Sequence, residues 1–223
     1  GRNPGDSGLP TTLSWTLPAG VTAGAIEWLP PRVLPAGPLT NYGYEDEALH
    51  PVTLRAAPGF AAQGNVTLAA RADWLVCRET CIPEGADLTL TLPVATHAAD
   101  DPRHGAALTA ALAQVPGALS AQGWRATATG EGQHVALQLT PPPGAPDAGA
   151  MRFFPDDDGR IEPSGTQTLA RRDGAYLLTL PVAYQLDKGF VRVTGLLTAA
   201  GAGFSGARAA TIDVPLSGAV AAG

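Results

Sequence analysis

The chain contains two cysteines, Cys77 and Cys81, and both lie in the stretch WLVCRETCIPE at residues 74–84. A pair of thiols at this spacing can serve three kinds of chemistry. It can form a disulfide that stabilises the fold, it can supply two ligands to a metal site, or it can be a dithiol that exchanges electrons with other proteins. The neighbouring elements and the other candidate ligands decide how these alternatives are weighed.

The spacing predicts that the chain turns between the two cysteines if they pair. Residues four apart in an extended strand lie about 13 Å apart, whereas a disulfide requires Cα atoms within about 4.4–6.8 Å of each other. Alternating apolar and polar residues predict strands at 66–76 and 87–94. The residues between these strands would then form their connection and would place both sulfurs at one end of a β-sandwich.

The size of the loop argues against a purely structural disulfide. Closing a loop of about five residues stabilises a protein by roughly 2 kcal/mol, against about 4.7 kcal/mol for a 100-residue loop. A short-loop disulfide is also more often strained, and strained or exposed disulfides are the labile or catalytic ones. We therefore favour a redox-active pair, with an inert clip as an alternative.

The histidines do not support a zinc site. A structural zinc ion needs four Cys or His ligands, and no two of the four histidines lie at a paired ligand spacing. We therefore expect a site without a metal or other cofactor. Cu(I) can be held by two thiolates alone, so a Cu(I)-binding copper-tolerance module is the alternative function. The histidines are His50, His97, His104 and His134.

The composition predicts an all-β protein. The chain has 27 Gly, 21 Pro and only 15% charged residues, which favours strands and turns. A net charge of -6 excludes the basic surface typical of nucleic-acid-binding proteins, and no apolar run approaches the roughly 18 residues of a membrane-spanning helix. Alternation with a period of two predicts further strands at 11–18, 50–57, 133–140, 175–182, 190–198 and 210–216.

One helix is expected in the middle of the chain, in the stretch DDPRHGAALTAALAQVPG. Asp101 is the predicted N-cap, Pro102 occupies the first helical position, and Pro116 and Gly117 end the helix. The polar residues before the helix are the best candidate for a linker. We therefore predict a first domain at 1–96, a linker at 97–105, and a second domain without cysteines at 106–223.

The motifs in this chain resemble a known family. RNPGDSGLPT at 2–11, EWLPPRVLP at 27–35, NYGYEDEALHPVTL at 41–54 and WLVCRETCIPE closely resemble the N-terminal periplasmic region of the DsbD/ScsB thiol:disulfide interchange proteins. The ScsB-like branch, linked with copper tolerance, is the nearer match. FFPDDDGRIEP at 153–163 resembles the second domain of that branch.

The resemblance implies two immunoglobulin-like β-sandwich domains in tandem, with a short helix near the start of the second. The first domain would carry the catalytic cysteine pair. Because the family has at least one strand before the RNPGDSG motif, we expect the N-terminal strand of the first domain to be missing.

The resemblance also implies a thiol-disulfide oxidoreductase in the periplasm, as the soluble portion of an inner-membrane protein. Membrane-embedded and thioredoxin-like domains of the same full-length protein would follow the chain. The membrane-embedded domain would pass electrons to the cysteine pair, which would reduce periplasmic thioredoxin-fold proteins. No nucleic acid is expected among the partners.

Family position assigns roles to the two thiols. The second cysteine attacks the partner disulfide, which makes Cys81 the nucleophile and Cys77 the resolving thiol. In this respect the chain departs from the family, which separates its cysteines by five residues where this chain has three. Arg78 favours the thiolate, whereas Glu79 and Glu84 oppose it.

The family shields its cysteines with a cap loop. The matching residues include Tyr42 and Gly43, while the acidic residues and the phenylalanine of the family loop are not kept. Tyr42 and Tyr44 would cover the thiols instead, or the site is less protected; alternatively, both tyrosines are half-buried strand residues. Trp74 is a further candidate to pack beside the thiols, with a place in the core as the alternative.

Overall fold

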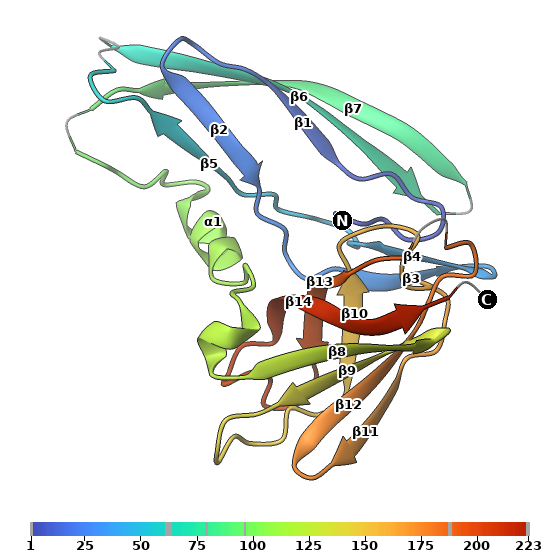
Figure 1. The fold of residues 1–223 in the computed structure, drawn as a ribbon. Helices are drawn as coiled ribbons and strands as arrows, with labels where there is room; N and C mark the ends of the chain where they lie inside the picture. The colour runs from blue at the N-terminus through green and yellow to red at the C-terminus, as the bar shows by residue number, and fades with distance from the viewer. Residues whose placement is uncertain (1, 61–63, 79, 96, 187–188, 222–223) are drawn as a thin grey trace. The chain divides into compact units, whose positions relative to one another are not determined.

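The computed structural model describes residues 2–60, 64–78, 80–95, 97–186 and 189–221. These residues are mostly in strands, with one short α-helix, which confirms the expected all-β class (Figure 1). The helices are α1 (Gly105–Leu112) and the short 3-10 helix η1 (Leu119–Gln122). The strands are β1 (Thr12–Thr16), β2 (Val21–Ile26), β3 (Arg32–Ala36), β4 (Leu39–Gly43), β5 (Val52–Ala56), β6 (Asn65–Cys77), β7 (Cys81–Pro93), β8 (Arg125–Gly132), β9 (His134–Thr140), β10 (Met151–Pro155), β11 (Thr168–Arg172), β12 (Ala175–Pro181), β13 (Arg192–Ala199) and β14 (Ala209–Val220).

The chain forms two compact units that do not follow the order of the sequence. The first unit consists mainly of Gly8–Leu29 and Tyr44–Val115, and it includes α1. The second unit contains Asn3–Ser7, Pro30–Gly43 and Pro116–Gly223. Two segments from the first part of the chain, including the β3–β4 hairpin, therefore belong with the second unit. The division into domains at 97–105 stays a prediction.

The first unit is built around a long β-hairpin. Strands β6 and β7 are each 13 residues long and pair antiparallel along their whole length, and β1 adds to the other edge of β6. Strands β2 and β5 form a second antiparallel pair. Leu68, Ala70 and Ala72 alternate along one face of β6 and are buried, as the period of a half-buried strand requires.

The edge strand β7 leaves much of its apolar side uncovered. Leu88, Leu90 and Leu92 point to the same face as the buried residues of β6, but they are 39–53% exposed. The alternation that predicted this strand therefore identified its apolar face correctly. The apolar side chains on this side of the sheet are buried on β6 but not on β7.

The second unit contains the larger core. Its strands follow the order β10-β13-β14-β8-β9-β12-β11, in which β14 pairs antiparallel with β13 through Pro215 and parallel with β8 from Leu216 onward. The β3–β4 hairpin is a separate antiparallel pair. The largest fully buried side chains of this unit are Trp124, Val135, Leu137, Leu139, Phe153, Tyr176, Leu178, Leu180, Leu197 and Phe204.

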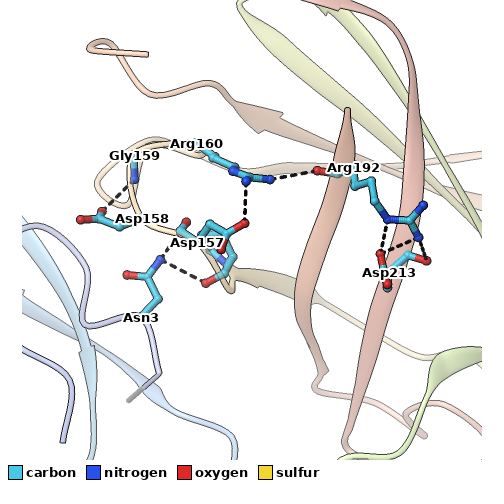
Figure 2. A network of polar contacts seen from close by, with 8 residues as sticks. Asn3, Asp157, Asp158, Gly159, Arg160, Arg192 and Asp213 are labelled. Atoms are coloured by element: carbon cyan, nitrogen blue, oxygen red, sulfur yellow. Dashed lines mark hydrogen bonds and ion pairs between the residues drawn. The ribbon is translucent and has the colours of Figure 1, made fainter. Parts of the chain in front are cut away.

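Asn3 ties the first residues of the chain into the second unit (Figure 2). Its side-chain Nδ2 donates to the backbone oxygens of Pro155 at 3.1 Å and Asp157 at 3.2 Å. Its Oδ1 accepts the N–H of Gly5 at 2.9 Å. Because Asn3 is 7% exposed, these bonds replace those that the amide would otherwise make with water.

The helix begins later than the sequence predicts. Asp101 was expected as the N-cap, but α1 begins at Gly105 and His104 occupies the N-cap position without a side-chain cap. The carboxylate of Asp101 instead accepts the N–H groups of Arg103 and His104, so it closes a turn that precedes the helix. The capping chemistry was recognised correctly and its position was wrong by one turn. No helix in the described part of the chain is long and apolar enough to span a bilayer.

Candidate active site at the tip of a hairpin

Cys77 and Cys81 form a disulfide at the tip of the β6–β7 hairpin. The sulfurs are 2.09 Å apart and the Cα atoms 4.0 Å apart. The cysteines face each other as the last pair of the antiparallel register. Between them the Arg78 N–H donates to the Thr80 oxygen at 3.4 Å. The expected turn between the cysteines is confirmed.

The strands extend further toward the cysteines than predicted. The connection was expected to span residues 77–85, but the ladder continues through Trp74 opposite Glu84 and Val76 opposite Ile82. Proline lacks an N–H, yet Pro83 is accommodated because β7 is an edge strand. The disulfide therefore joins two residues that the hairpin already holds in register.

The tip of the hairpin is open to solvent. Cys77 is exposed and Cys81 half-buried. The neighbouring pair on the other face, Val76 and Ile82, is 45% and 57% exposed. A thiolate of another protein can therefore approach the disulfide. The exposed apolar side chains of Val76 and Ile82 lie next to it at the tip of the hairpin.

Strand register determines which residues share the face of the disulfide. Successive side chains of a strand point to opposite faces, so every second pair lies on the cysteine face. Moving away from the tip, these pairs are Leu75 with Pro83, Asp73 with Gly85, and Arg71 with Asp87. We call this set, together with the two cysteines, the cysteine face.

The cysteine face carries an ion-pair network. Arg71 Nε lies 2.9 Å from Asp73 Oδ1, and Arg71 Nη1 lies 3.5 Å from Asp87 Oδ1. The hydrogen bond to Asp73 raises the pKa of Arg71, with a smaller contribution from Asp87. A side chain at Gly85 would meet the guanidinium of Arg71 and the carboxylate of Asp73, so glycine leaves room for the network.

Sequence reasoning missed this network, although its signal was present. Arg71 and Asp73 have odd residue numbers, as Cys77 does in the same strand. Asp87 also has an odd residue number, in the next strand. The shared parity shows which face each residue occupies within its own strand. The pairing of the two strands, which brings the three charges together, depends on the register.

The residues expected to tune the thiols lie in different places. Arg78 is exposed in the turn. Glu84 pairs with Trp74 and points to the face opposite the disulfide, because it is three residues from Cys81. Glu79 lies outside the described residues. The influence of these residues on thiol reactivity stays a prediction.

Two of the residues expected to shield the thiols end β4, in the second unit. Tyr42 is 3% exposed and packs edge-to-face against Phe154, with ring centroids 5.1 Å apart. Burial raises the pKa of Tyr42, with a smaller opposing effect from Arg152. Gly43 follows Tyr42 and is half-buried. Tyr42 is thus a buried residue with an aromatic partner in its own unit, and its shielding role stays a prediction.

The other two expected shielding residues lie in the first unit. Tyr44 donates its hydroxyl to the Leu29 oxygen at 2.7 Å and packs against His50, and burial raises its pKa to about 12. The His50 ring also contacts Trp28. Trp74 is half-buried on the apolar face of β6, so the pleat directs it away from the sulfurs. The roles of Tyr44 and Trp74 in shielding the thiols stay predictions.

The oxidised pair can accept two electrons, and the reduced pair would present two neighbouring thiols. Within the described residues, no group of three His, Cys, Asp or Glu side chains is arranged to hold a metal ion. A disulfide with one exposed cysteine can take part in thiol–disulfide exchange.

Comparison with known proteins agrees with this geometry. Residues 2–93 match the family described as thiol:disulfide interchange protein DsbD, N-terminal, which has an immunoglobulin-like β-sandwich fold. No curated protein matches the chain. Among solved structures, the N-terminal periplasmic domain of ScsB from Proteus mirabilis matches with a TM-score of 0.64 and 16% identity, over 100% of this chain and 81% of that one. Over its whole length, the chain therefore has the fold of the ScsB periplasmic domain. Over residues 2–93, which include both cysteines, it is similar to the N-terminal domain of the DsbD thiol:disulfide interchange proteins.

Proposed function

We propose that this chain is a periplasmic thiol-disulfide oxidoreductase domain that relays electrons through Cys77 and Cys81. A membrane-embedded domain of the same full-length protein would reduce the pair, and the pair would reduce thioredoxin-fold proteins of the periplasm. The observation that carries the proposal is an exposed disulfide at a hairpin tip, between residues that the strands already hold in register. The match of residues 2–93 to the DsbD N-terminal family supports it.

The proposed reaction proceeds through a mixed disulfide. The Cys81 thiolate attacks one sulfur of the partner disulfide, so the partner S–S bond breaks and one partner thiolate leaves. The Cys77 thiolate then attacks the Cys81 sulfur, which releases the second partner thiolate and forms the Cys77–Cys81 disulfide. Two electrons pass to the partner, whose two thiolates take up the two protons that Cys77 and Cys81 have lost.

The hairpin supports rapid resolution of the mixed disulfide. The Cα atoms of the two cysteines are 4.0 Å apart in the oxidised state, and the strands continue to pair through Val76 and Ile82. The resolving thiol would therefore stay close to the mixed disulfide without a search through conformations.

Trapping with single-cysteine variants tests the proposal. Cys77→Ala should accumulate a mixed disulfide, through Cys81, with an oxidised thioredoxin-fold protein, detected on a non-reducing gel and by mass spectrometry. Cys81→Ala is the matched control and should trap less, because Cys77 is the resolving thiol. If neither variant traps a partner, and the pair does not equilibrate with a glutathione redox buffer, the relay is refuted.

A second candidate function is Cu(I) binding by the same two thiolates. The observation that favours it is the position of both cysteines on one face, because two facing thiolates suffice to coordinate Cu(I). One Cu(I) per reduced chain, lost in both single-cysteine variants, together with no exchange activity would favour this function over the relay.

A further inference from the structure

The cysteine face carries charges at a defined distance from the disulfide. Asp87 lies on β7 six residues from Cys81, which corresponds to roughly 20 Å along an extended strand. Its side chain is 88% exposed, and its ion pair with Arg71 spans 3.5 Å. By comparison, Asp73 is 50% exposed and holds the Arg71 guanidinium at 2.9 Å. Asp87 thus keeps most of its capacity to accept a further cation.

A protein that docks on the disulfide must cover part of this face. A stable protein–protein interface buries about 800 Å² on each partner, which corresponds to a patch of roughly 16 Å radius. Because the disulfide lies at the tip of the hairpin, such a patch extends from the tip along the strands. On the side of the sulfurs it meets Leu75 and Pro83 first and the charged network next.

The network has two carboxylates and one guanidinium, so its net charge is negative. Gly85 lets Arg71 lie across the hairpin between the two aspartates, where it cannot neutralise both. Where the partner lies over this network, the excess carboxylate therefore favours a cationic group on the partner.

We propose that the cysteine face is the docking surface for the exchange partner, and that Asp87 selects a partner with a basic side chain about 20 Å from its reactive sulfur. This inference rests on the proposed exchange function and names the chemistry of its partner. Leu75 and Pro83 supply apolar contact next to the sulfurs, and Asp87 supplies charge recognition further along the hairpin.

Two synthetic peptides provide the test. Each has a central cysteine in a mixed disulfide with thionitrobenzoate, and a charged residue six positions away on both sides, lysine in one peptide and glutamate in the other. Attack by the reduced chain on the peptide sulfur releases coloured thionitrobenzoate, and the second cysteine then releases the peptide thiol. The readout is the ratio of the lysine-peptide rate to the glutamate-peptide rate at low ionic strength, in which changes of thiol reactivity cancel.

The unmodified chain should prefer the lysine peptide. Asp87→Asn should lower the ratio roughly two- to fivefold, in line with exposed ion pairs, and Arg71→Gln should raise it. Glu84→Gln is the matched control, because it removes one negative charge from the same strand but on the opposite face. It should change the ratio by less than Asp87→Asn does.

Two results would overturn the inference, and one would overturn its premise. If Asp87→Asn and Glu84→Gln change the ratio equally, only the overall charge of the chain matters. If the unmodified chain shows no preference between the peptides, the surface does not select a basic partner. If neither peptide nor a small uncharged disulfide is reduced, the exchange function itself fails.

Discussion

Removal of the Cys77–Cys81 disulfide should cost little stability. The bond closes a loop of five residues, for which the chain-entropy model gives about 2 kcal/mol. The pairing of β6 with β7 supplies the other constraints, because the register continues from Val76 opposite Ile82 to Asn65 opposite Pro93. We expect the reduced chain to remain folded, with a free energy of unfolding lower by at most about 2 kcal/mol.

Urea unfolding of the oxidised chain, the dithiothreitol-reduced chain and a Cys77→Ser/Cys81→Ser variant measures this cost. Because the two compact units can unfold separately, tryptophan fluorescence and circular dichroism should be recorded together. The loss should be confined to the transition of the first unit, which contains Trp15, Trp28 and Trp74. Dithiothreitol should reduce the disulfide without denaturant, because Cys77 is exposed.

A disulfide that behaves as a structural staple would contradict this small cost. A loss of more than about 4 kcal/mol would match the upper part of the range for native disulfides and would exceed what a five-residue loop can supply. Resistance to dithiothreitol until the protein unfolds would have the same meaning. Either result would return the pair to the inert-clip alternative.

Three further predictions concern the surrounding structure. Leu68→Ala should destabilise the first unit by about 2–5 kcal/mol, whereas Leu90→Ala, at the directly opposed and 53% exposed position, should cost less than half as much in a urea titration. Asn3→Ala should lower the unfolding free energy of the second unit by roughly 1–3 kcal/mol, because it leaves one buried carbonyl, one half-buried carbonyl and a buried N–H without their partner; an unchanged urea midpoint would contradict this. Tyr44 should ionise near pH 12 in the folded chain against about 10 when unfolded, so its contribution to stability is full below pH 10 and is lost as pH rises through 12. Absorbance at 295 nm, with Tyr44→Phe as the reference, measures the titration, and a titration near pH 10 would refute it.

The strands with clear alternation were predictable from local pattern. The expected segments at 66–76, 133–140 and 175–182 agree within a few residues with β6, β9 and β12. Strands without that pattern were missed, because neighbouring strands rather than their own composition make them strands. Strand β8 has alanine as its only apolar residue type and yet lies between β14 and β9.

The burial of predicted strands was less predictable than their existence. The leucines of β7 have the pattern of an inward-facing row, but burial depends on whether another layer covers that part of the sheet. Tyr42 shows the same dependence. Its aromatic partner is Phe154, more than one hundred residues further along the chain, so the local motif does not reveal the contact that buries it.

The sequence by itself determined that a disulfide within this chain must join Cys77 to Cys81 and that the chain must turn between them. These conclusions follow from the number of cysteines and the length of an extended segment, which are local quantities. The tertiary structure alone decided that the strands continue to the cysteines, that the disulfide lies exposed at the tip, and that Arg71, Asp73 and Asp87 share its face. These features depend on strand register and layer packing, which arise from contacts between residues far apart in the sequence.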